Sequence, residues 1–288
     1  MYTELHALTL THLQSEIVSC WQNAERETAK DVLQKYYDPP EEFVTRLFCG
    51  ELRYVVGSAS EAGLISQAFV KDLLSIPDID RSSVWDIQRM PLVATVNFHN
   101  QKHESRISAS DLGIVITRPT VTVDPYGHGG VQVRTGHASG LLAQAKLGRY
   151  SKDRFKWGRL RKRQESLFPE VNDFYAILLY RLTGERFNEL QPFGWHLCKD
   201  HSLDEIKSWL RSDGFPKQLL SEQIIGALFS DVTVGIQDQE IIKKVIDPNK
   251  SPLQVIDIEI SWPDGPPSDG SLRLITNQEQ QVEQHLKY

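Results

Sequence analysis

The sequence has few cysteines, and their spacing matches neither a disulfide framework nor a metal site. Cys20, Cys49 and Cys198 stand far apart and are odd in number, which is typical of packed thiols in a reducing compartment. Long apolar runs are also missing, since no stretch approaches the roughly 20 residues that span a membrane. The first residues show no basic region followed by an apolar stretch. We therefore expect a cytoplasmic protein without a membrane partner.

What the chain does contain is ordinary for a globular protein, with 40% hydrophobic and 24% charged residues in 288. Its charge is unevenly distributed. The 18 residues from Lys146 to Arg163 hold nine lysines or arginines and one acid, a net charge of +8. The total is −6, so the remaining 270 residues carry −14. Such a run indicates either a solvated helix face or a surface that attracts an anionic partner such as nucleic acid.

The most informative segment, residues 139–149, ends just inside this basic run. Its glycine-bounded apolar residues predict a buried strand. Strand side chains repeat every second position, so Gln144 and Lys146 point to the same side. A lysine so close to a core requires a partner, and a second apolar strand upstream opens with Asp111. We expect the two strands to be neighbours that bring Asp111, Gln144 and Lys146 together.

A carboxylate and a second oxygen ligand beside a lysine suit metal-dependent hydrolysis of nucleic acid. Asp111 can hold Mg²⁺, which prefers carboxylate and water ligands. Lys146 can orient the attacking water or stabilise the transition state. Four histidines, His99, His103, His128 and His137, match no standard zinc spacing. We interpret most of them as loop residues and single out His103, which adjoins Glu104.

The remaining pattern predicts the fold class. Residues 1–38, 43–56 and 64–74 have helical periodicity, with a helix start at Asp38-Pro-Pro-Glu-Glu42. Short strands are expected at 92–98, 111–116, 120–123 and 131–134, followed by a helix from Trp157 and a returning strand at 173–180. Strands without intervening helices pair antiparallel, whereas a strand–helix–strand unit is a parallel crossover. We expect an α/β protein whose mixed sheet is flanked by helices.

Three parts follow from this order along the chain. Residues 1–76 form an N-terminal helical layer that packs on the core, 77–182 form the core, and 183–288 form a C-terminal α/β extension. In the extension, helices are expected at 203–211 and 216–229, and a half-exposed strand at 255–262.

Four of these features together resemble the PD-(D/E)xK superfamily of restriction-endonuclease-like nucleases, in the form that has glutamine in place of the second acid. The segment Ala109-Ser-Asp-Leu-Gly113 preceded by Glu104 is similar to one of its motifs. The "LLAQAK" strand at 141–146 is similar to another. A helix bearing Gln164 and the strand "FYAILLY" at 174–180 follow in the same order.

The resemblance covers about residues 42–182 and implies a restriction-endonuclease-like fold with Mg²⁺- or Mn²⁺-dependent endonuclease activity. It implies that Asp111, Gln144 and Glu104 hold the metal and that Lys146 acts in catalysis. DNA is the favoured substrate, bound by Arg149, Lys152, Arg159, Arg161, Lys162, Arg163 and Gln164. Such nucleases often serve as effectors in bacterial anti-phage defence with a sensor, helicase or ATPase partner, and we carry this context as an expectation.

The glutamine leaves alternatives open. A neutral carbonyl oxygen binds a metal less well than a carboxylate, and Glu104 is expected to supply the missing charge. If it does not, the chain is a catalytically inactive nucleic-acid-binding module with a nuclease-like fold. A further alternative is an assembly subunit whose basic run binds an acidic protein.

Overall fold

The computed structural model describes residues 10–35, 39–76, 92–97, 110–123, 131–151, 154–183, 189–212, 215–229, 254–261 and 271–273. Its helices are α1 (Thr11–Lys35), α2 (Glu41–Glu61), α3 (Leu64–Leu74), α5 (Lys162–Val171), the 3₁₀ turn η1 (Asn172–Phe174), α6 (Leu203–Arg211) and α7 (Ser221–Phe229). Its strands are β1 (Val93–Asn97), β2 (Leu112–Val123), β3 (Val131–Ser151), β4 (Arg154–Lys156), β5 (Tyr175–Thr183), β6 (Glu189–Leu190), β7 (Gly194–Leu197), β8 (Leu219–Leu220), β9 (Gln254–Ser261) and β10 (Ser271–Arg273).

One mixed sheet organises the molecule, in the order β1-β9-β2-β3-β5-β7-β8. The hairpin of β2 and β3 is antiparallel, and β5 returns parallel to β3 through α5. The predicted α/β class with a mixed sheet flanked by helices is therefore confirmed. The expected adjacency of the Asp111 and Lys146 strands is confirmed as well, with the 173–180 strand beside them.

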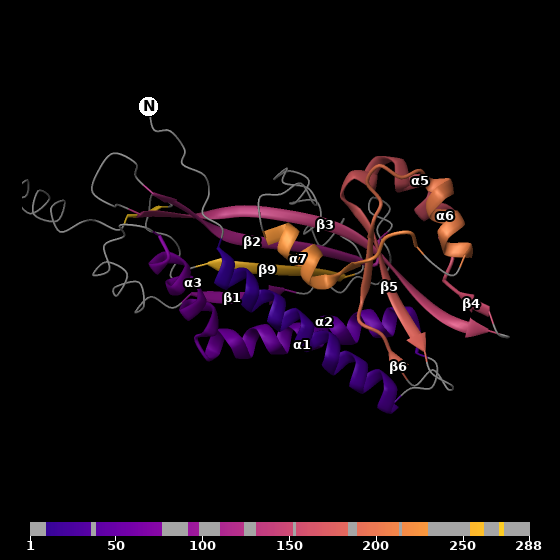
Figure 1. Ribbon diagram of the computed structural model, residues 1–288, viewed down its shortest axis with the longest axis horizontal. Coiled ribbons are helices and arrows are strands. Elements are labelled where there is room, and N and C mark those ends of the chain that lie inside the picture. Colours follow the sequence, from indigo (N-terminus) through magenta and orange to yellow (C-terminus); the bar gives the residue numbers. More distant parts are fainter. Residues whose placement is uncertain are drawn as a thin grey trace, which may run out of the picture.

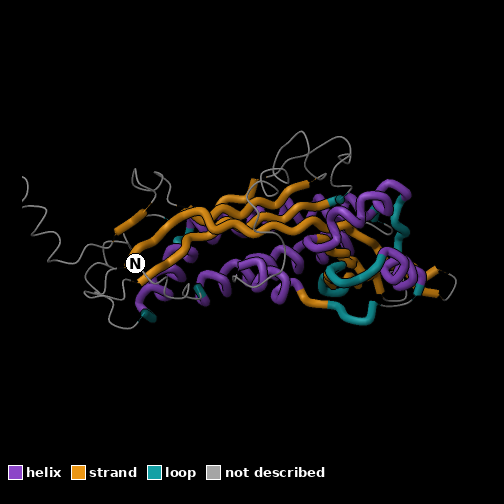
Figure 2. Tube along the Cα trace, turned by 90° about the horizontal axis from the view of Figure 1, so that it is seen from above, coloured by secondary structure: helices purple, strands orange, loops and turns teal. Residues whose placement is uncertain are grey.

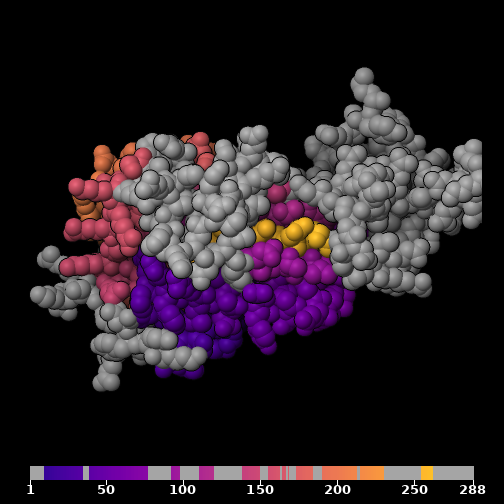
Figure 3. Space-filling view, turned by 180° about the vertical axis from the view of Figure 1, so that it is seen from behind, coloured from indigo at the N-terminus to yellow at the C-terminus, as the bar shows by residue number. Residues whose placement is uncertain are grey.

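Helices cover the two faces of the sheet unequally. α1, α2, α3 and α7 bury one apolar face, whose core includes Ile114 and Leu178. Near one end of the sheet, α5 and α6 bury the opposite face around Ile177 and Leu179. Figure 2 shows the long strands as one layer with helices lying beneath it. Seen from behind, the indigo-to-purple helices form a broad surface, and the pink segments around residue 150 gather at one end of the molecule (Figure 3).

The N-terminal helices lie where their periodicity predicts, and a carboxylate joins two of them. Asp72 of α3, only 4% exposed, accepts hydrogen bonds from the backbone N–H groups of His12 and Leu13 at 2.8 and 2.9 Å. These donors at the start of α1 have no partner within their own helix. The cap therefore fixes α1 against α3, and both helices cover the sheet (Figure 1).

The strands are longer and more central than their sequences predict. The two short strands expected at 120–123 and 131–134 are continuations of β2 and β3. The strand expected at 255–262 is β9. It lies between β1 and β2 and pairs with both. From Ile256 onward its burial alternates as expected, with Glu259 exposed, and Gln254 and Val255 before it are both buried. The sheet thus takes strands from both sides of residue 182.

The helix expected from Trp157 begins only at Lys162. Before it, β4 folds back on β3, with Arg149 opposite Lys156. Gly148 permits this close approach, because a Cβ there would meet the Phe155 and Trp157 rings at 2.4 and 2.6 Å. Both rings are buried, and the Arg181 guanidinium lies 4.5 Å from the centroid of Phe155. Aromatic packing therefore overrides the helical pattern at 157–161.

The remaining expectations concern thiols and membranes. Cys20, Cys49 and Cys198 are buried and free, as packed thiols should be. Burial raises the pKa of Cys20 to about 11, so this thiol is a poor nucleophile near neutral pH. None of the helices in the described ranges is long and apolar enough to cross a membrane.

Candidate active site

The site lies where β2 begins and β3 continues alone on that edge. Leu112 is the first β2 residue paired with β3, opposite Ala143, whereas β5 accompanies the other edge of β3 as far as Gly148. Alternate residues of a strand present their backbone N–H groups to the same edge. The N–H groups of Ala145 and Leu147 therefore point to the edge that β2 leaves uncovered.

The Asp111 carboxylate takes the first of these donors. Its Oδ2 accepts a hydrogen bond from the Ala145 N–H at 3.0 Å and another from the Gln144 side-chain amide. The Asp111 backbone is held from two sides, because its N–H donates to the Ala143 carbonyl and its carbonyl accepts from the Gln254 N–H, both at 3.1 Å. β9 thus helps to position the carboxylate from the far end of the sequence.

A second carboxylate, Glu41, takes the next donor. It belongs to the first turn of α2, and its Oε2 accepts from the Leu147 N–H at 2.7 Å. Its Oε1 lies 3.4 Å from the Lys146 Nζ. The turn is anchored to the sheet by a 3.0 Å hydrogen bond between the Thr45 and Tyr180 hydroxyls. Burial raises the pKa of this tyrosine well above its usual value, so the hydroxyl stays protonated.

Gln144 and Lys146 project toward the α5 side of the sheet, as strand alternation predicts. Both are nearly inaccessible, at 1% and 4% exposure. The Gln144 Oε1 accepts from the Gln164 side-chain amide at 2.6 Å and from the Tyr175 hydroxyl at 3.4 Å. Lys146 pairs with Glu41, although the sequence had pointed to Asp111 as its partner. Gln164, expected among the nucleic-acid-binding residues, lies in α5, is 4% exposed and donates its side-chain amide to Gln144.

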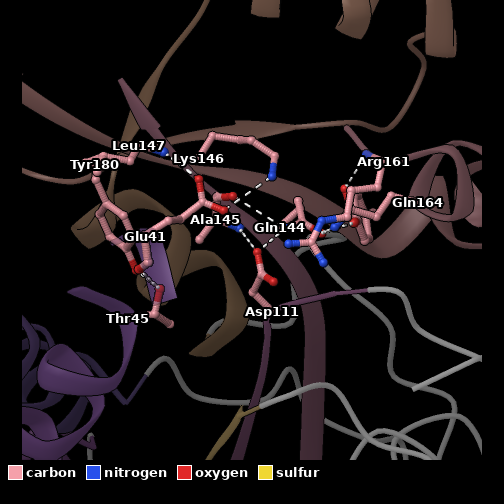
Figure 4. Close-up of polar contacts among 11 residues, drawn as sticks. Glu41, Thr45, Asp111, Gln144, Ala145, Lys146, Leu147, Arg161, Gln164 and Tyr180 are labelled. Atoms are coloured by element: carbon pink, nitrogen blue, oxygen red, sulfur yellow. Dashed lines mark hydrogen bonds and ion pairs between the residues drawn. The ribbon is translucent and has the colours of Figure 1, made fainter. Parts of the chain in front are cut away.

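These groups line a cavity of about 120 Å³ (Figure 4). Its walls carry carboxylates and cations in equal number: Glu41, Glu42, Asp111, Lys146, Arg159 and Arg161. Gly158 brings the β4–α5 loop close to it, since a Cβ there would lie 3.3 Å from Glu41 Oε2 and 3.4 Å from Lys146 Cδ. The cavity is therefore small and polar, and its charged side chains are balanced in sign.

Of the predicted nucleic-acid-binding residues, Arg159, Arg161 and Gln164 line this cavity. Arg159, Arg161 and Lys162 are exposed and lie on the β4–α5 loop or at the start of α5. Arg149 is half-buried near the end of β3 and Arg163 lies in α5. Lys152 and Glu104 lie outside the described residues, as do His99, His103 and His128.

The described carboxylates partly fit a divalent metal. Mg²⁺ is usually held by one or two carboxylates together with water and substrate oxygens, and Asp111 and Glu41 supply two. No cluster of three or more His, Cys, Asp or Glu side chains suited to a metal occurs within the described ranges. Gln144, predicted as a third ligand, turns its amide nitrogen toward Asp111 and its oxygen toward Gln164. Among the described residues, the candidate ligands are therefore the carboxylates that line the cavity, Glu41, Glu42 and Asp111.

The sequence pattern does not mark Glu41 as a site residue. The motif Asp38-Pro-Pro-Glu-Glu42 predicts a helix start, and acidic residues do occupy the first turn of α2. The same acids are favoured there by the helix dipole, so the local pattern has a sufficient structural explanation. What distinguishes Glu41 is its contact with β3, more than 100 residues away.

A larger cavity of about 380 Å³ lies elsewhere, between α1, the β6–β7 segment and the start of α7. Glu25 lines it and accepts hydrogen bonds from the Trp21 indole at 3.0 Å and from the Ser221 hydroxyl. Burial raises the pKa of Glu25 to about 7. No pattern in the sequence predicts this buried carboxyl group.

Comparisons with known proteins add no relative: no protein-family model, curated protein or solved structure matches the chain.

Proposed function

We propose that the chain is a metal-dependent nuclease that hydrolyses phosphodiester bonds, with DNA as the favoured substrate. The observation that supports this most strongly is that Asp111 and Glu41 accept hydrogen bonds from two β3 amides, those of Ala145 and Leu147. Lys146 lies between these two residues in the sequence and pairs with Glu41. The two carboxylates come from a strand start and a helix start that are 70 residues apart.

In this proposal the side chains divide the work by charge. Asp111 and Glu41 hold Mg²⁺ or Mn²⁺, and when bound the ion supplies electrostatic stabilisation of the phosphate. Lys146 stabilises the negative charge that develops during hydrolysis or orients the attacking water. Arg159 and Arg161 border the cavity and bind the flanking phosphates, which makes affinity fall with salt concentration.

A second candidate is a nucleic-acid-binding module without catalysis. It is favoured by the internal pairing of the site. Both Glu41 oxygens are engaged by Lys146 and Leu147, and the Asp111 Oδ2 accepts from Gln144 and Ala145. A pocket whose charges already neutralise one another can be a structural relic of a catalytic site.

One experiment separates the two candidates. The protein is incubated with plasmid DNA, linear DNA, single-stranded DNA and RNA, in Mg²⁺, Mn²⁺ or EDTA. A nuclease cleaves at least one substrate with a metal ion, stops in EDTA, and loses cleavage in Asp111→Asn while still binding the substrate. Asp173→Asn, which alters an exposed aspartate before β5, is the matched control and should cleave normally. Binding without cleavage under every condition would support the second candidate.

A further inference from the structure

A directed series of hydrogen bonds ends at Asp111. The backbone N–H of Arg161 donates to the Gln164 Oε1 at 2.8 Å. The Gln164 Nε2 donates to the Gln144 Oε1 at 2.6 Å, and the Gln144 Nε2 donates to the Asp111 Oδ2. The series joins the β4–α5 loop to the proposed metal site through two buried amides.

Chemistry fixes the direction of this series at both ends. A backbone N–H can only donate, so it requires the oxygen of Gln164. At the other end, the Asp111 Oδ2 already accepts from the Ala145 backbone N–H, and as an acceptor it faces the nitrogen of Gln144. Two further groups agree: the Ala145 carbonyl lies 3.4 Å from the Gln144 Nε2, and the Tyr175 hydroxyl donates to its Oε1.

Turning the Gln144 amide would place oxygen against oxygen and nitrogen against nitrogen. Gln144 and Gln164 are 1% and 4% exposed, so water cannot readily replace the lost partners, and buried polar groups without partners are costly. A metal ligand must offer an oxygen, yet this amide directs its oxygen away from Asp111.

We propose that Gln144 is a positioning residue that holds Asp111 through its amide N–H, and that the metal is bound by Asp111 and Glu41 without Gln144 as a ligand. Gln164 fixes the orientation of Gln144. This inference rests on the proposed function, because it concerns the metal of that same site. It departs from what the sequence resemblance implies for Gln144.

The test is a calorimetric titration of Mn²⁺ into the full-length wild type, Asp111→Asn and Gln144→Met, with folding checked by circular dichroism. Methionine keeps the length of the side chain and removes both polar atoms. We expect Gln144→Met to bind Mn²⁺ within about threefold of the wild type, and Asp111→Asn to bind at least tenfold more weakly. If Gln144→Met does not fold, Gln144→Ala, which leaves room for water, is titrated instead with the same expectation.

Kinetics supply the readout that separates positioning from packing. A positioning role lowers kcat at saturating Mn²⁺ while Mn²⁺ affinity is retained, and Gln164→Met should lower it in the same way. A packing role alone would lower Tm and leave kcat of the folded protein unchanged, which would overturn the inference.

Two outcomes of the titration separate a failure of this inference from a failure of the proposed metal-dependent function. Loss of Mn²⁺ affinity in Gln144→Met to the level of Asp111→Asn would make the amide oxygen a ligand and overturn the inference alone. Absence of Mn²⁺ binding by the wild type would overturn the metal-dependent function, and this inference with it.

Discussion

Two regions of the molecule hold carboxyl groups beside a cavity, and the hydrogen-bond partners of these carboxyl groups differ. At the β3 edge, Asp111 and Glu41 accept hydrogen bonds from backbone amides, and Lys146 pairs with Glu41. Near α7, the described residues that donate to Glu25 are neutral, the Trp21 indole and the Ser221 hydroxyl among them. Burial therefore dominates there and raises its pKa to about 7.

The two regions also differ in the volume and the lining of their cavities. The cavity beside Glu25 has about three times the volume of the one beside Asp111. Yet only the smaller one combines carboxylates, a buried lysine and exposed arginines. The polar groups that compensate a charge, rather than the space around it, identify the region suited to phosphate and metal chemistry.

The largest expected effect comes from replacing Lys146, the lysine at the smaller cavity. Lys146→Ala should lower the cleavage rate by at least about 100-fold, the usual scale for losing one preorganised charge-stabilising group. Single-turnover cleavage at saturating protein measures this, and an electrophoretic assay in EDTA checks that substrate binding persists. Lys199→Ala, an exposed lysine after β7, is the control. Cleavage by Lys146→Ala near the wild-type rate would remove Lys146 from catalysis.

Adding a carboxylate beside Asp111 should destabilise the folded protein unless a metal ion is bound. Gln144→Glu places a second buried carboxylate against Asp111, so without metal the variant should lose roughly 2–4 kcal/mol of stability. Saturating Mn²⁺ should raise its Tm by more than it raises the Tm of the wild type. Thermal unfolding with and without Mn²⁺ measures both effects. Equal Tm shifts in the two proteins would mean that no metal sits beside position 144.

At the larger cavity, Glu25 should make the stability of the folded protein depend on pH. Because the folded-state pKa of Glu25 is raised from 4.5 to about 7, the folded protein binds more protons than the unfolded chain between these values. Its stability should then fall by about 2–3 kcal/mol as pH rises from 4.5 to above 7. Glu25→Gln should remove this part of the dependence and be more stable than the wild type at pH 8.

Urea unfolding from pH 5 to pH 8 measures the contribution of Glu25. The matched control is Glu222→Gln, which alters an exposed carboxyl at the same cavity and should keep the wild-type pH dependence. If the stability of Glu25→Gln falls as steeply with pH as that of the wild type, burial of Glu25 is not the cause.

The smallest effect concerns the basic loop that only the β3-edge region has. Replacing Arg159, Arg161 and Lys162 together by Ala should weaken nucleic-acid binding and flatten its dependence on salt. Each lost phosphate contact lowers the log–log slope by about 0.9 on double-stranded DNA. Fluorescence anisotropy at several salt concentrations measures the slope, with the exposed Lys71 of α3 replaced by Ala as control. An unchanged slope would make the loop an ordinary solvated surface.

Much of the fold could be predicted because it depends on local patterns. The helices at 11–35, 41–61 and 64–74 follow from helical periodicity, and the adjacency of the Asp111 and Lys146 strands follows from their order and polarity. β9 could not be placed, because its insertion between β1 and β2 depends on pairing with strands more than 130 residues away. Its alternating pattern from Ile256 onward gave no sign of two neighbours.

The site residues likewise differ in whether the local sequence pattern predicts them. Asp111, Gln144, Lys146 and Gln164 could be predicted to meet because they belong to one hairpin and one crossover. Glu41 could not be predicted to join them, because its contact with β3 depends on where the first turn of α2 lies against the sheet. The orientation of the Gln144 amide was also beyond the sequence, because it depends on the Arg161 backbone N–H and on Tyr175 together.

The central claim is that Asp111 and Glu41 serve one metal ion, and a double-mutant cycle tests it most directly. Mn²⁺ affinity is measured for the wild type, Asp111→Asn, Glu41→Gln and the double variant, with Glu61→Gln at the other end of α2 as control. If both carboxylates bind the same ion, the double variant should be little worse than the weaker single variant, because residues that act as a unit are not additive. Fully additive losses, or an affinity for Mn²⁺ that neither substitution changes, would contradict the account.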